Sequence, residues 1–176
     1  MRRYFDAPLF ASIFTTKAFL PAMAQLPSKR FLGVVPIPAA QVINIQTPAG
    51  LAFLRGATLY TSCRHALHGF STALAADLTG TRVKVQEIVL GEVSSSYWSA
   101  NPQSRERLPL LAQLIPSLSE ERAARCVIAG IRSGAPQAIY PLTIHCLVWT
   151  HWLSPSFIEW ILTMTSPGEA NPEGPQ

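Results

Sequence analysis

Charged side chains are scarce in this sequence. Asp, Glu, Lys and Arg together make up 14% of the 176 residues, compared with about 25% in an average domain, and the mean hydropathy is +0.22. The net charge of +4 comes from scattered basic residues, and no Lys/Arg-rich run with interleaved aromatic residues occurs. We therefore expect one apolar domain and no nucleic-acid-binding surface.

Metal-site and disulfide patterns are missing as well. The cysteines are odd in number (Cys63, Cys126 and Cys146) and form no C-x-x-C pair. Neither His65 nor His68 has a partner at ligand spacing. The pattern favours free thiols in a reducing compartment and argues against a metal site.

A glycine-rich turn is also absent from these 176 residues. Gly33 and Gly50 are isolated, and no stretch reads G-x-G-x-x-G or G-x-x-x-G-x-G. Such a turn lets the backbone approach a pyrophosphate at the N-terminus of a helix. The strongest sequence signal for holding a dinucleotide is therefore not found here.

The first forty residues predict a helix and a loop. Asp6, Pro8 and Lys17 interrupt the early apolar stretch, so we do not expect a signal peptide. Residues 9–25 instead predict an amphipathic helix. Residues 27–41 are rich in proline and predict an inserted loop.

The centre of the chain is the stretch from Val42 to Leu78. A short β-branched run ends in the turn sequence Thr-Pro-Ala-Gly, which is typical of a buried parallel strand. Apolar residues then recur every three or four positions, which predicts a long helix that stops near Gly80. The apolar face of this helix comprises Leu59, Cys63, Ala66, Leu67, Phe70, Leu74 and Leu78.

Three polar residues of this stretch are candidates for proton chemistry. Tyr60 and Arg64 are four residues apart, so both side chains leave the same face of the helix. A cation beside a phenol favours the phenolate form, which suits a proton donor and acceptor. Thr47, at the end of the strand, could hydrogen-bond the oxygen that changes charge. A solvated Tyr–Arg pair and a simple turn threonine remain alternative interpretations.

This order of motifs resembles the short-chain dehydrogenases/reductases. That family has a serine thirteen residues before a tyrosine and a lysine four residues after it, which correspond to Thr47, Tyr60 and Arg64 here. Its downstream Pro-Gly-x-Val-x-Thr corresponds to Leu90-Gly91-Glu92-Val93-Ser94-Ser95, and residues 16–23 look like its preceding helix. The resemblance covers roughly residues 5–165.

The resemblance implies a fold, a cofactor and roles for residues. The fold would be α/β, a partial Rossmann-like (doubly wound) parallel sheet containing the catalytic half only, with C-terminal helices. The strand near Val42 would then lack a neighbour on one side. Tyr60 and Arg64 would act in catalysis and bind NAD or NADP, with Thr47 as the catalytic hydroxyl, and Gly91, Val93 and Ser95 would touch the nicotinamide end.

Three departures from the family pattern bear on the chemistry. Threonine in place of serine keeps the hydroxyl. Arg64 in place of lysine keeps the charge but is bulkier and planar, so it is not an equivalent substitution. Leu90 replaces a proline that shapes the turn over the nicotinamide in the family.

The second half of the chain continues the alternation of strands and helices. Residues 82–90 predict a strand that is parallel and adjacent to the first. Residues 94–117 would cover the substrate, with Tyr97, Trp98 and residues 108–114 lining an apolar pocket. Residues 118–132 predict a helix with a Ser117/Glu120 capping box, a buried face of Val127, Ile128 and Ile131, and a stop at Ser133-Gly134.

The tail from residue 139 to residue 165 is apolar and contains Trp149, Trp152 and Trp160. Polar residues and prolines interrupt it, so it does not predict a spanning helix. Two interpretations remain: a helical segment that packs on the domain or on a second subunit, and a membrane-interface segment. Within the family, residues 132–141 are most similar to the membrane-associated, steroid- or lipid-handling branch. Residues 166–176 predict a disordered tail.

Two functions are consistent with these observations. One is an NAD(P)-dependent oxidoreductase acting on an apolar alcohol or ketone, impaired by the missing glycine-rich half and located on the cytoplasmic side, in contact with a membrane. The other is a catalytically silent, truncated relative that acts as an interaction fragment or is an incomplete gene product. The partners expected are an apolar small molecule, a membrane interface and a second copy of the chain.

Overall fold

The computed structural model of the protein describes residues 5–27, 29–31, 35–37, 39–54, 56–96, 108 and 115–166. In chain order the elements are η1 (Asp6–Phe10), α2 (Ala11–Gln25), β1 (Lys29–Phe31), β2 (Val35–Ile37), β3 (Ala40–Gln46), η2 (Pro48–Gly50), α3 (Thr58–Asp77), β4 (Val83–Leu90), β5 (Val93–Ser94), β6 (Leu118–Ser119), α7 (Glu120–Ser133), β7 (Gln137–Tyr140), α8 (Leu142–Leu153) and α9 (Pro155–Thr165).

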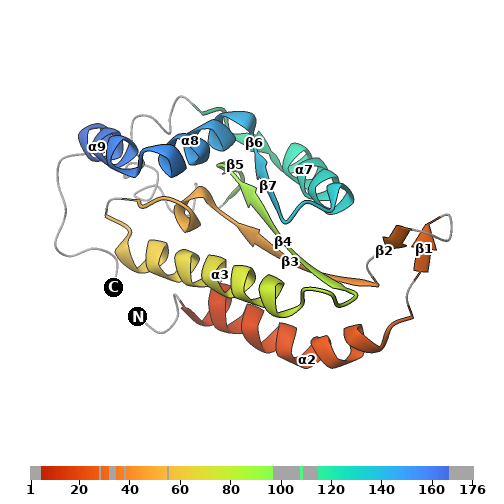
Figure 1. The fold of residues 1–176 in the computed structure, drawn as a ribbon. Helices are drawn as coiled ribbons and strands as arrows, with labels where there is room; N and C mark the ends of the chain where they lie inside the picture. Colours follow the sequence, from red (N-terminus) through yellow and green to blue (C-terminus); the bar gives the residue numbers. More distant parts are fainter. Residues whose placement is uncertain are drawn as a thin grey trace.

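A three-stranded parallel sheet with the order β3-β4-β7 forms the centre of the fold (Figure 1). Strand β3 pairs with β4 along its whole length, from Ala40 opposite Val83 to Gln46 opposite Val89. The predicted parallel, adjacent strands are therefore confirmed. In the described part of the chain, β3 has a partner strand on one side only, as the resemblance implied.

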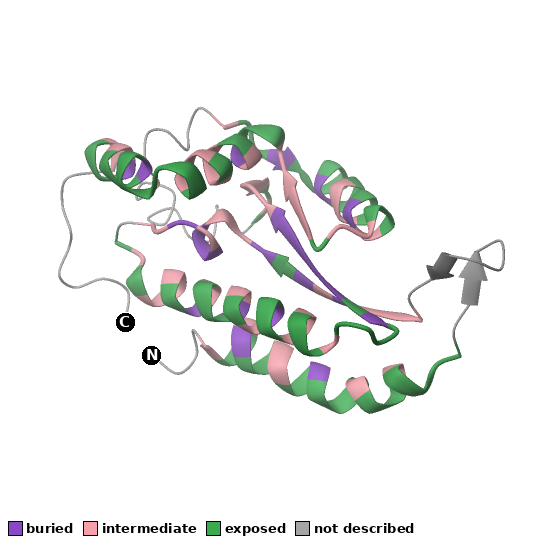
Figure 2. Ribbon diagram, in the orientation of Figure 1, coloured by how far each residue is buried: buried purple, intermediate pink, exposed green. Residues whose placement is uncertain are grey.

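Helices cover both faces of the sheet. Figure 1 shows α2 and α3 on one face and α7 and α8 on the other. Consecutive residues of β4 illustrate this, because Gln86 bonds the carbonyl of Gly130 in α7 while Glu87 contacts His68 in α3. Strand β4 is consequently the most buried element (Figure 2), and Ile88 and Val89 are completely buried.

The apolar core has two parts on the α3 side of the sheet. Leu9, Cys63 and Leu67 form one cluster between η1 and α3. Val42, Val83 and Val85 form the other, and residues of α2 and α3 pack against it. The helix predicted at 59–78 is thus confirmed, and Gly80 with φ of +81° follows its end.

The N-terminal helix differs from the amphipathic helix that we expected. Thr16 is the buried residue of α2, whereas the Phe14 and Phe19 side chains are 65% and 59% exposed. Apolar side chains therefore face outward as well as inward. The stretch Asp6–Gln25 is long and apolar enough to cross a membrane by length and composition alone, a test that core helices and signal sequences also pass.

The structure corrects one expected loop and one expected helix cap. Residues 27–41 contain the antiparallel pair β1–β2 and the beginning of β3, so the segment is not a plain loop. The cap of α7 is Ser119, whose hydroxyl accepts a hydrogen bond from the backbone N–H of Arg122, and not Ser117. The stop at Gly134 is confirmed by its φ of +65°.

The buried face of α7 is also different from the predicted one. Ala123 and Gly130 are buried, whereas Ile128 is 48% exposed. Gly130 fits because a Cβ there would lie 3.0 Å from Cδ1 of Ile88. Small residues therefore let α7 approach the sheet closely, and an apolar spacing pattern does not reveal this arrangement.

The predicted helical tail is confirmed as the pair α8 and α9. Its first residues are different, because Ile139 and Tyr140 belong to β7 and not to a helix. The disordered tail predicted at 166–176 lies outside the described residues apart from Ser166, which follows α9.

Candidate active site

The candidate residues lie where parallel strands end. Thr47 follows β3 directly and Gly91 follows β4, and the strand register places Gln46 opposite Val89. Helix α3 begins at Thr58 and runs back along the sheet, so its first turns lie at the same end (Figure 1). Ligands of open α/β sheets bind at this end, outside the carboxyl ends of the strands.

Tyr60 and Arg64 are in contact. The guanidinium carbon of Arg64 lies 5.2 Å from the centroid of the Tyr60 ring, within the range of a cation–π interaction. The same guanidinium reaches the carbonyl oxygen of Ile45 in β3, with 3.5 Å between Nη1 and the oxygen. The arginine therefore touches the face of the phenol ring and the end of the strand together.

The Nε of Arg64 has no partner. This atom is buried and makes no hydrogen bond within the described part of the chain. A buried donor without an acceptor costs roughly 1–3 kcal/mol, so an acceptor brought to this position would gain a strong, charge-assisted hydrogen bond.

Gln46 is a residue of the site that the sequence analysis missed. Its side chain is 3% exposed, and its Nε2 donates a 2.7 Å hydrogen bond to the carbonyl of Arg64. Its Oε1 accepts from the backbone N–H of Thr47 at 3.3 Å. Gly50 makes room for it, since a Cβ at Gly50 would lie 2.6 Å from Nε2 of Gln46. The sequence signal that was available is that Gln46 falls on the same strand face as Val42 and Asn44 and stands four residues before Gly50.

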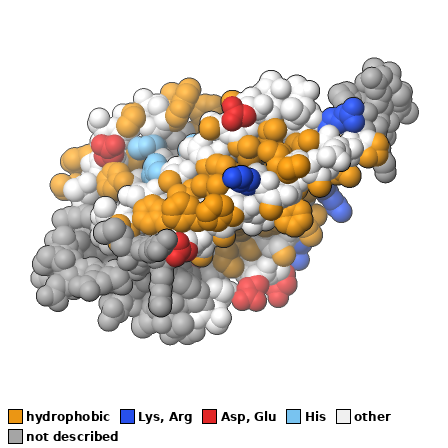
Figure 3. Space-filling model, turned by 90° about the horizontal axis from the view of Figure 1, so that it is seen from below, with side chains coloured by type: hydrophobic (Ala, Val, Ile, Leu, Met, Phe, Trp, Pro, Cys, Tyr) orange, Lys and Arg blue, Asp and Glu red, His pale blue; other side chains and the backbone are white. Residues whose placement is uncertain are grey.

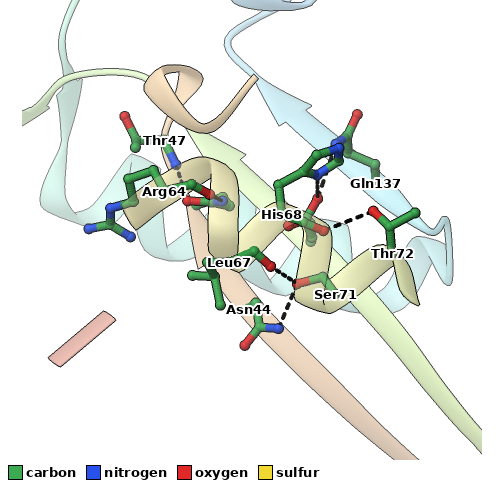
Figure 4. Close-up of polar contacts among 10 residues, drawn as sticks. Asn44, Thr47, Arg64, Leu67, His68, Ser71, Thr72 and Gln137 are labelled. Carbon is green, nitrogen blue, oxygen red and sulfur yellow. Dashed lines mark hydrogen bonds and ion pairs between the residues drawn. The ribbon is translucent and has the colours of Figure 1, made fainter. Parts of the chain in front are cut away.

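Thr47 is held through its backbone. Its N–H bonds Gln46, and its carbonyl accepts from the N–H of Gly50 at 2.9 Å. Figure 4 shows Thr47 and Arg64 at the same end of the sheet. The approach of the Thr47 hydroxyl to the oxygen of Tyr60 stays a prediction.

The residues expected at the nicotinamide end follow β4. Gly91 donates its N–H to the carbonyl of Tyr140 at 2.8 Å, and a Cβ on Gly91 would lie 3.1 Å from Cδ of Pro141. Val93 pairs with Leu118 in the small β5–β6 sheet, and Ser95 is half-buried. A side chain at Gly91 would therefore press against Pro141, and the cofactor role of these three residues stays a prediction.

A second polar group joins the middle of α3 to the sheet (Figure 4). Asn44 donates to the hydroxyl of Ser71 at 2.8 Å, and both residues are buried. His68 contacts Glu87 of β4, with 2.6 Å between Nδ1 and Oε2, and Gln137 of β7 donates to the same oxygen at 3.3 Å. The hydrogen bond that the ring donates to Glu87 raises the pKa of His68, burial opposes this, and the charge of Glu87 adds to the rise.

Sequence spacing could not reveal the His68–Glu87 pair, because nineteen residues separate the two. The signal was an acid inside an otherwise apolar strand, VKVQEIVL, since a carboxylate buried at such a position needs a partner. The predicted absence of a metal site stays a prediction.

Two hollows adjoin the site without including its central residues. One of about 350 Å³ lies between α2 and β3 and is lined by Thr16, Phe19, Val42 and Asn44, among others. The other, of about 470 Å³, lies at the start of α3 and is lined by residues including Phe53, Thr61 and Thr163. The apolar pocket expected around Tyr97, Trp98 and residues 108–114 lies outside the described residues apart from Leu108.

Comparison with known proteins identifies the chain. The sequence profile of the short chain dehydrogenase family matches residues 1–106. An uncharacterized oxidoreductase of Staphylococcus aureus is 28% identical over 104 residues, which cover 58% of this chain and 40% of that protein. The chain belongs to the short-chain dehydrogenase family.

Solved structures support the fold. A short chain dehydrogenase from Burkholderia cenocepacia in complex with NADP is similar with a TM-score of 0.70 and 15% identity, over 92% of this chain and 58% of that one. A short chain dehydrogenase/reductase from Burkholderia phymatum in complex with NAD gives a TM-score of 0.62 and 15% identity, over 87% and 57%. The partial Rossmann-like fold is therefore confirmed, and the chain spans about half the length of these relatives.

Proposed function

We propose that this chain is the catalytic part of an oxidoreductase that transfers a hydride between a nicotinamide cofactor and an apolar alcohol or ketone. The observation that carries the proposal is the contact of Tyr60 with Arg64 at the carboxyl end of a parallel strand, in a chain of the short-chain dehydrogenase family. The apolar substrate is proposed from the scarcity of charge in the chain.

Each residue has a defined task in this proposal. Tyr60 gives a proton to the carbonyl oxygen, or takes it from the alcohol, as general acid and base. Arg64 supplies positive charge beside the phenol, and its unpartnered Nε offers a donor to the cofactor. Thr47 hydrogen-bonds the substrate oxygen, and Gly91, Val93 and Ser95 form the floor near the nicotinamide.

NAD or NADP is proposed as the cofactor because similar structures contain NADP and NAD. The residues described above fit the nicotinamide end only. The glycine-rich turn that would hold the pyrophosphate is not in the sequence, and among the described residues β3 has a partner strand on one side only. We therefore propose that these 176 residues bind the cofactor weakly and act slowly.

A fluorescence titration with NADPH and with NADH tests this proposal. A saturable change in nicotinamide fluorescence supports the proposal if the dissociation constant is up to about 1 mM, which corresponds to a binding free energy of about −4.1 kcal/mol. The Arg64→Gln variant should weaken that binding because it removes the charge. An unchanged signal at about 1 mM of either cofactor would refute binding by this chain and would favour the second candidate.

The second candidate is a catalytically silent interaction fragment. Two observations favour it: β3 has no second partner strand within the residues that the structure describes, and Ile45 on that strand is 45% exposed. An unpaired strand edge is a template for pairing with another chain. Absence of turnover in the wild type as well as in Tyr60→Phe would support this candidate over the enzyme.

A membrane contact through α8 and α9 is a further part of the proposal. Trp152 and Leu153 are 78% and 75% exposed, and Trp149 and Trp160 are also more than half exposed. The two helices carry a single acidic residue, Glu159, and no Lys or Arg. Exposed tryptophans among apolar residues suit the interface of a bilayer, here on its cytoplasmic side.

Vesicle binding tests the membrane contact. We expect tryptophan fluorescence to shift to shorter wavelength with phosphatidylcholine vesicles, and the shift to be lost in Trp152→Ser/Leu153→Ser. Phe14→Ser/Phe19→Ser is the matched control, because these exposed residues lie in α2, on the opposite face of the sheet. Equal losses in both variants would contradict a specific α8–α9 contact.

Self-association is proposed through the face that carries α2. Figure 3 shows hydrophobic side chains gathered along this face, with few charges among them. Phe10, Phe14 and Phe19 are exposed there, and Phe10 stacks on Phe14 with 6.1 Å between ring centroids. Sedimentation measures the mass of the wild type and of Phe14→Ser/Phe19→Ser, and we expect the larger mass for the wild type. Equal masses would refute self-association through this face.

A further inference from the structure

Polar side chains of β3 and β4 attach helix α3 to the sheet, and a side chain of β7 supports one of these contacts. Gln46 and Asn44 bind it from β3. Glu87 binds it from β4, and Gln137 of β7 supports Glu87. The acid–base pair His68–Glu87 is the member of this set that can change charge near neutral pH.

Glu87 is a buried acid with an incomplete set of partners. The residue is 4% exposed. Its Oε2 is in hydrogen-bond contact with Nδ1 of His68 and accepts a hydrogen bond from the side-chain amide of Gln137. Its Oε1 is buried and has no hydrogen bond within the described part of the chain. A buried carboxylate of this kind depends strongly on a positive partner, because its charge is otherwise poorly compensated.

His68 can supply that charge and can exchange its proton with solvent. Its side chain is 37% exposed, so the ring has access to water although its Nδ1 points to Glu87. A protonated ring donates from Nδ1 to the carboxylate as a charge-assisted hydrogen bond. A neutral ring can still donate one hydrogen bond, but it adds no positive charge.

The surroundings contain few other charges. On α3, Arg64 lies one turn before His68 and faces Tyr60 and Ile45, and His65 is exposed and contacts its own helix at the carbonyl of Thr61. On the strands, Glu87 contacts His68 directly. The other polar side chains that bind α3 or Glu87 from the sheet are the neutral amides of Asn44, Gln46 and Gln137. Glu87 is therefore the charge that acts on His68.

We propose that His68, Glu87 and Gln137 form a protonation-dependent clamp that holds α3 against β4 and β7 and thereby positions Tyr60 and Arg64. The link to Tyr60 and Arg64 rests on the proposed function, whereas the clamp itself does not. Arg64 and His68 are one helical turn apart, so the carbonyl that Gln46 binds lies next to the clamped turn. His68 is thus a positioning residue and does not touch the reacting atoms.

The direction of the pH effect follows from the sign of the shift. The pKa of His68 is raised in the folded protein because Glu87 favours the protonated ring. The stabilisation is therefore complete at pH values below the pKa of unfolded histidine and is lost as pH rises through the raised pKa. The clamp is closed under slightly acidic conditions and loosens toward alkaline pH.

An NMR titration of the histidine Cε1–H signals tests the clamp without any need for turnover. We expect His68 to titrate at a higher pH in the wild type than in Glu87→Gln. An equal His68 midpoint in the two proteins would overturn the proposal. If Glu87→Gln fails to fold, comparison of the wild-type His68 midpoint with that of the urea-unfolded chain serves instead, and equal midpoints would overturn the proposal.

Thermal unfolding between pH 6 and pH 8.5 gives an independent test. As the pH rises over this range, the unfolding temperature of the wild type and of the matched control His65→Gln should fall by about 2–4 °C more than that of His68→Gln. The reason is that glutamine keeps a hydrogen bond to Glu87 but cannot titrate. Parallel curves for all three proteins would contradict the clamp.

If turnover is measurable, the pH profile of kcat should flatten in His68→Gln with KM unchanged. A flattened unfolding curve with no turnover would refute the proposed function and leave the clamp intact.

Discussion

The side-chain amide of Gln46 binds the main-chain carbonyl of Arg64 at 2.7 Å. This hydrogen bond joins the last residue of β3 to the first half of α3, so the strand end and the candidate catalytic helix are held together. Gly50 lies against the same contact, with only 3.1 Å between a Cβ built there and the Arg64 carbonyl oxygen.

Gly50→Ala should therefore destabilise the protein. The added methyl group would lie 2.6 Å from Nε2 and 2.9 Å from Cδ of Gln46, and overpacking of this kind costs about 1–3 kcal/mol. Gly69→Ala is the matched control, because no atom lies within 4 Å of a Cβ at this position inside α3. It should stabilise the chain by about 0.5–1 kcal/mol. Urea unfolding measures both, and equal effects would contradict this account.

Asn44→Ala should lower the free energy of unfolding by about 1–3 kcal/mol, because it removes a buried hydrogen bond to Ser71. The Ser71 hydroxyl keeps its bond to the carbonyl of Leu67. A double-mutant cycle with Ser71→Ala isolates the contact. Strictly additive effects in urea unfolding would show that the two side chains are not coupled.

Tyr60→Phe should separate activity from stability. The ring face that contacts the Arg64 guanidinium is kept, so the unfolding midpoint should not change. Loss of the hydroxyl should lower turnover of an apolar ketone by about 10²–10⁴-fold. Turnover equal to that of the wild type in this variant would remove Tyr60 from the proposed mechanism.

The three cysteines should react with iodoacetamide at different rates. Cys63 is 1% exposed, and burial raises the pKa of its thiol although Arg64 opposes this. Cys146 is exposed and Cys126 half-buried. Since the thiolate is the reactive form, mass spectrometry should find Cys146 modified first and Cys63 protected until urea is added. Early labelling of Cys63 in the native protein would contradict the packing of α3.

The elements with strong local patterns could be predicted from the sequence. The β-branched run of β3, the periodic face of α3 and the valines of β4 indicated a parallel β-α-β unit, and this unit is what the structure contains. Tyr60 and Arg64 were found because their spacing on one helix fixes their relative position.

Features that depend on distant partners could not be predicted. Strand β7 has four residues and lies directly before α8, so its pattern was merged with that of the helix. Glu87 meets His68 and Gln137 only after the sheet has formed, over separations of nineteen and fifty residues. The outward position of Ile128 results from the close approach of Gly130 to Ile88, which no local period encodes.

The two outer strands of the sheet are unequal. Strand β7 is four residues long and is followed at once by Pro141, whereas β3 offers seven residues without a proline or a charged side chain. A proline cannot donate a ladder hydrogen bond, so a strand added beside β7 could pair along four residues only before it meets Pro141. Within the described part of the chain, β3 therefore offers the longer outer edge, and a strand added there could pair from Ala40 to Gln46.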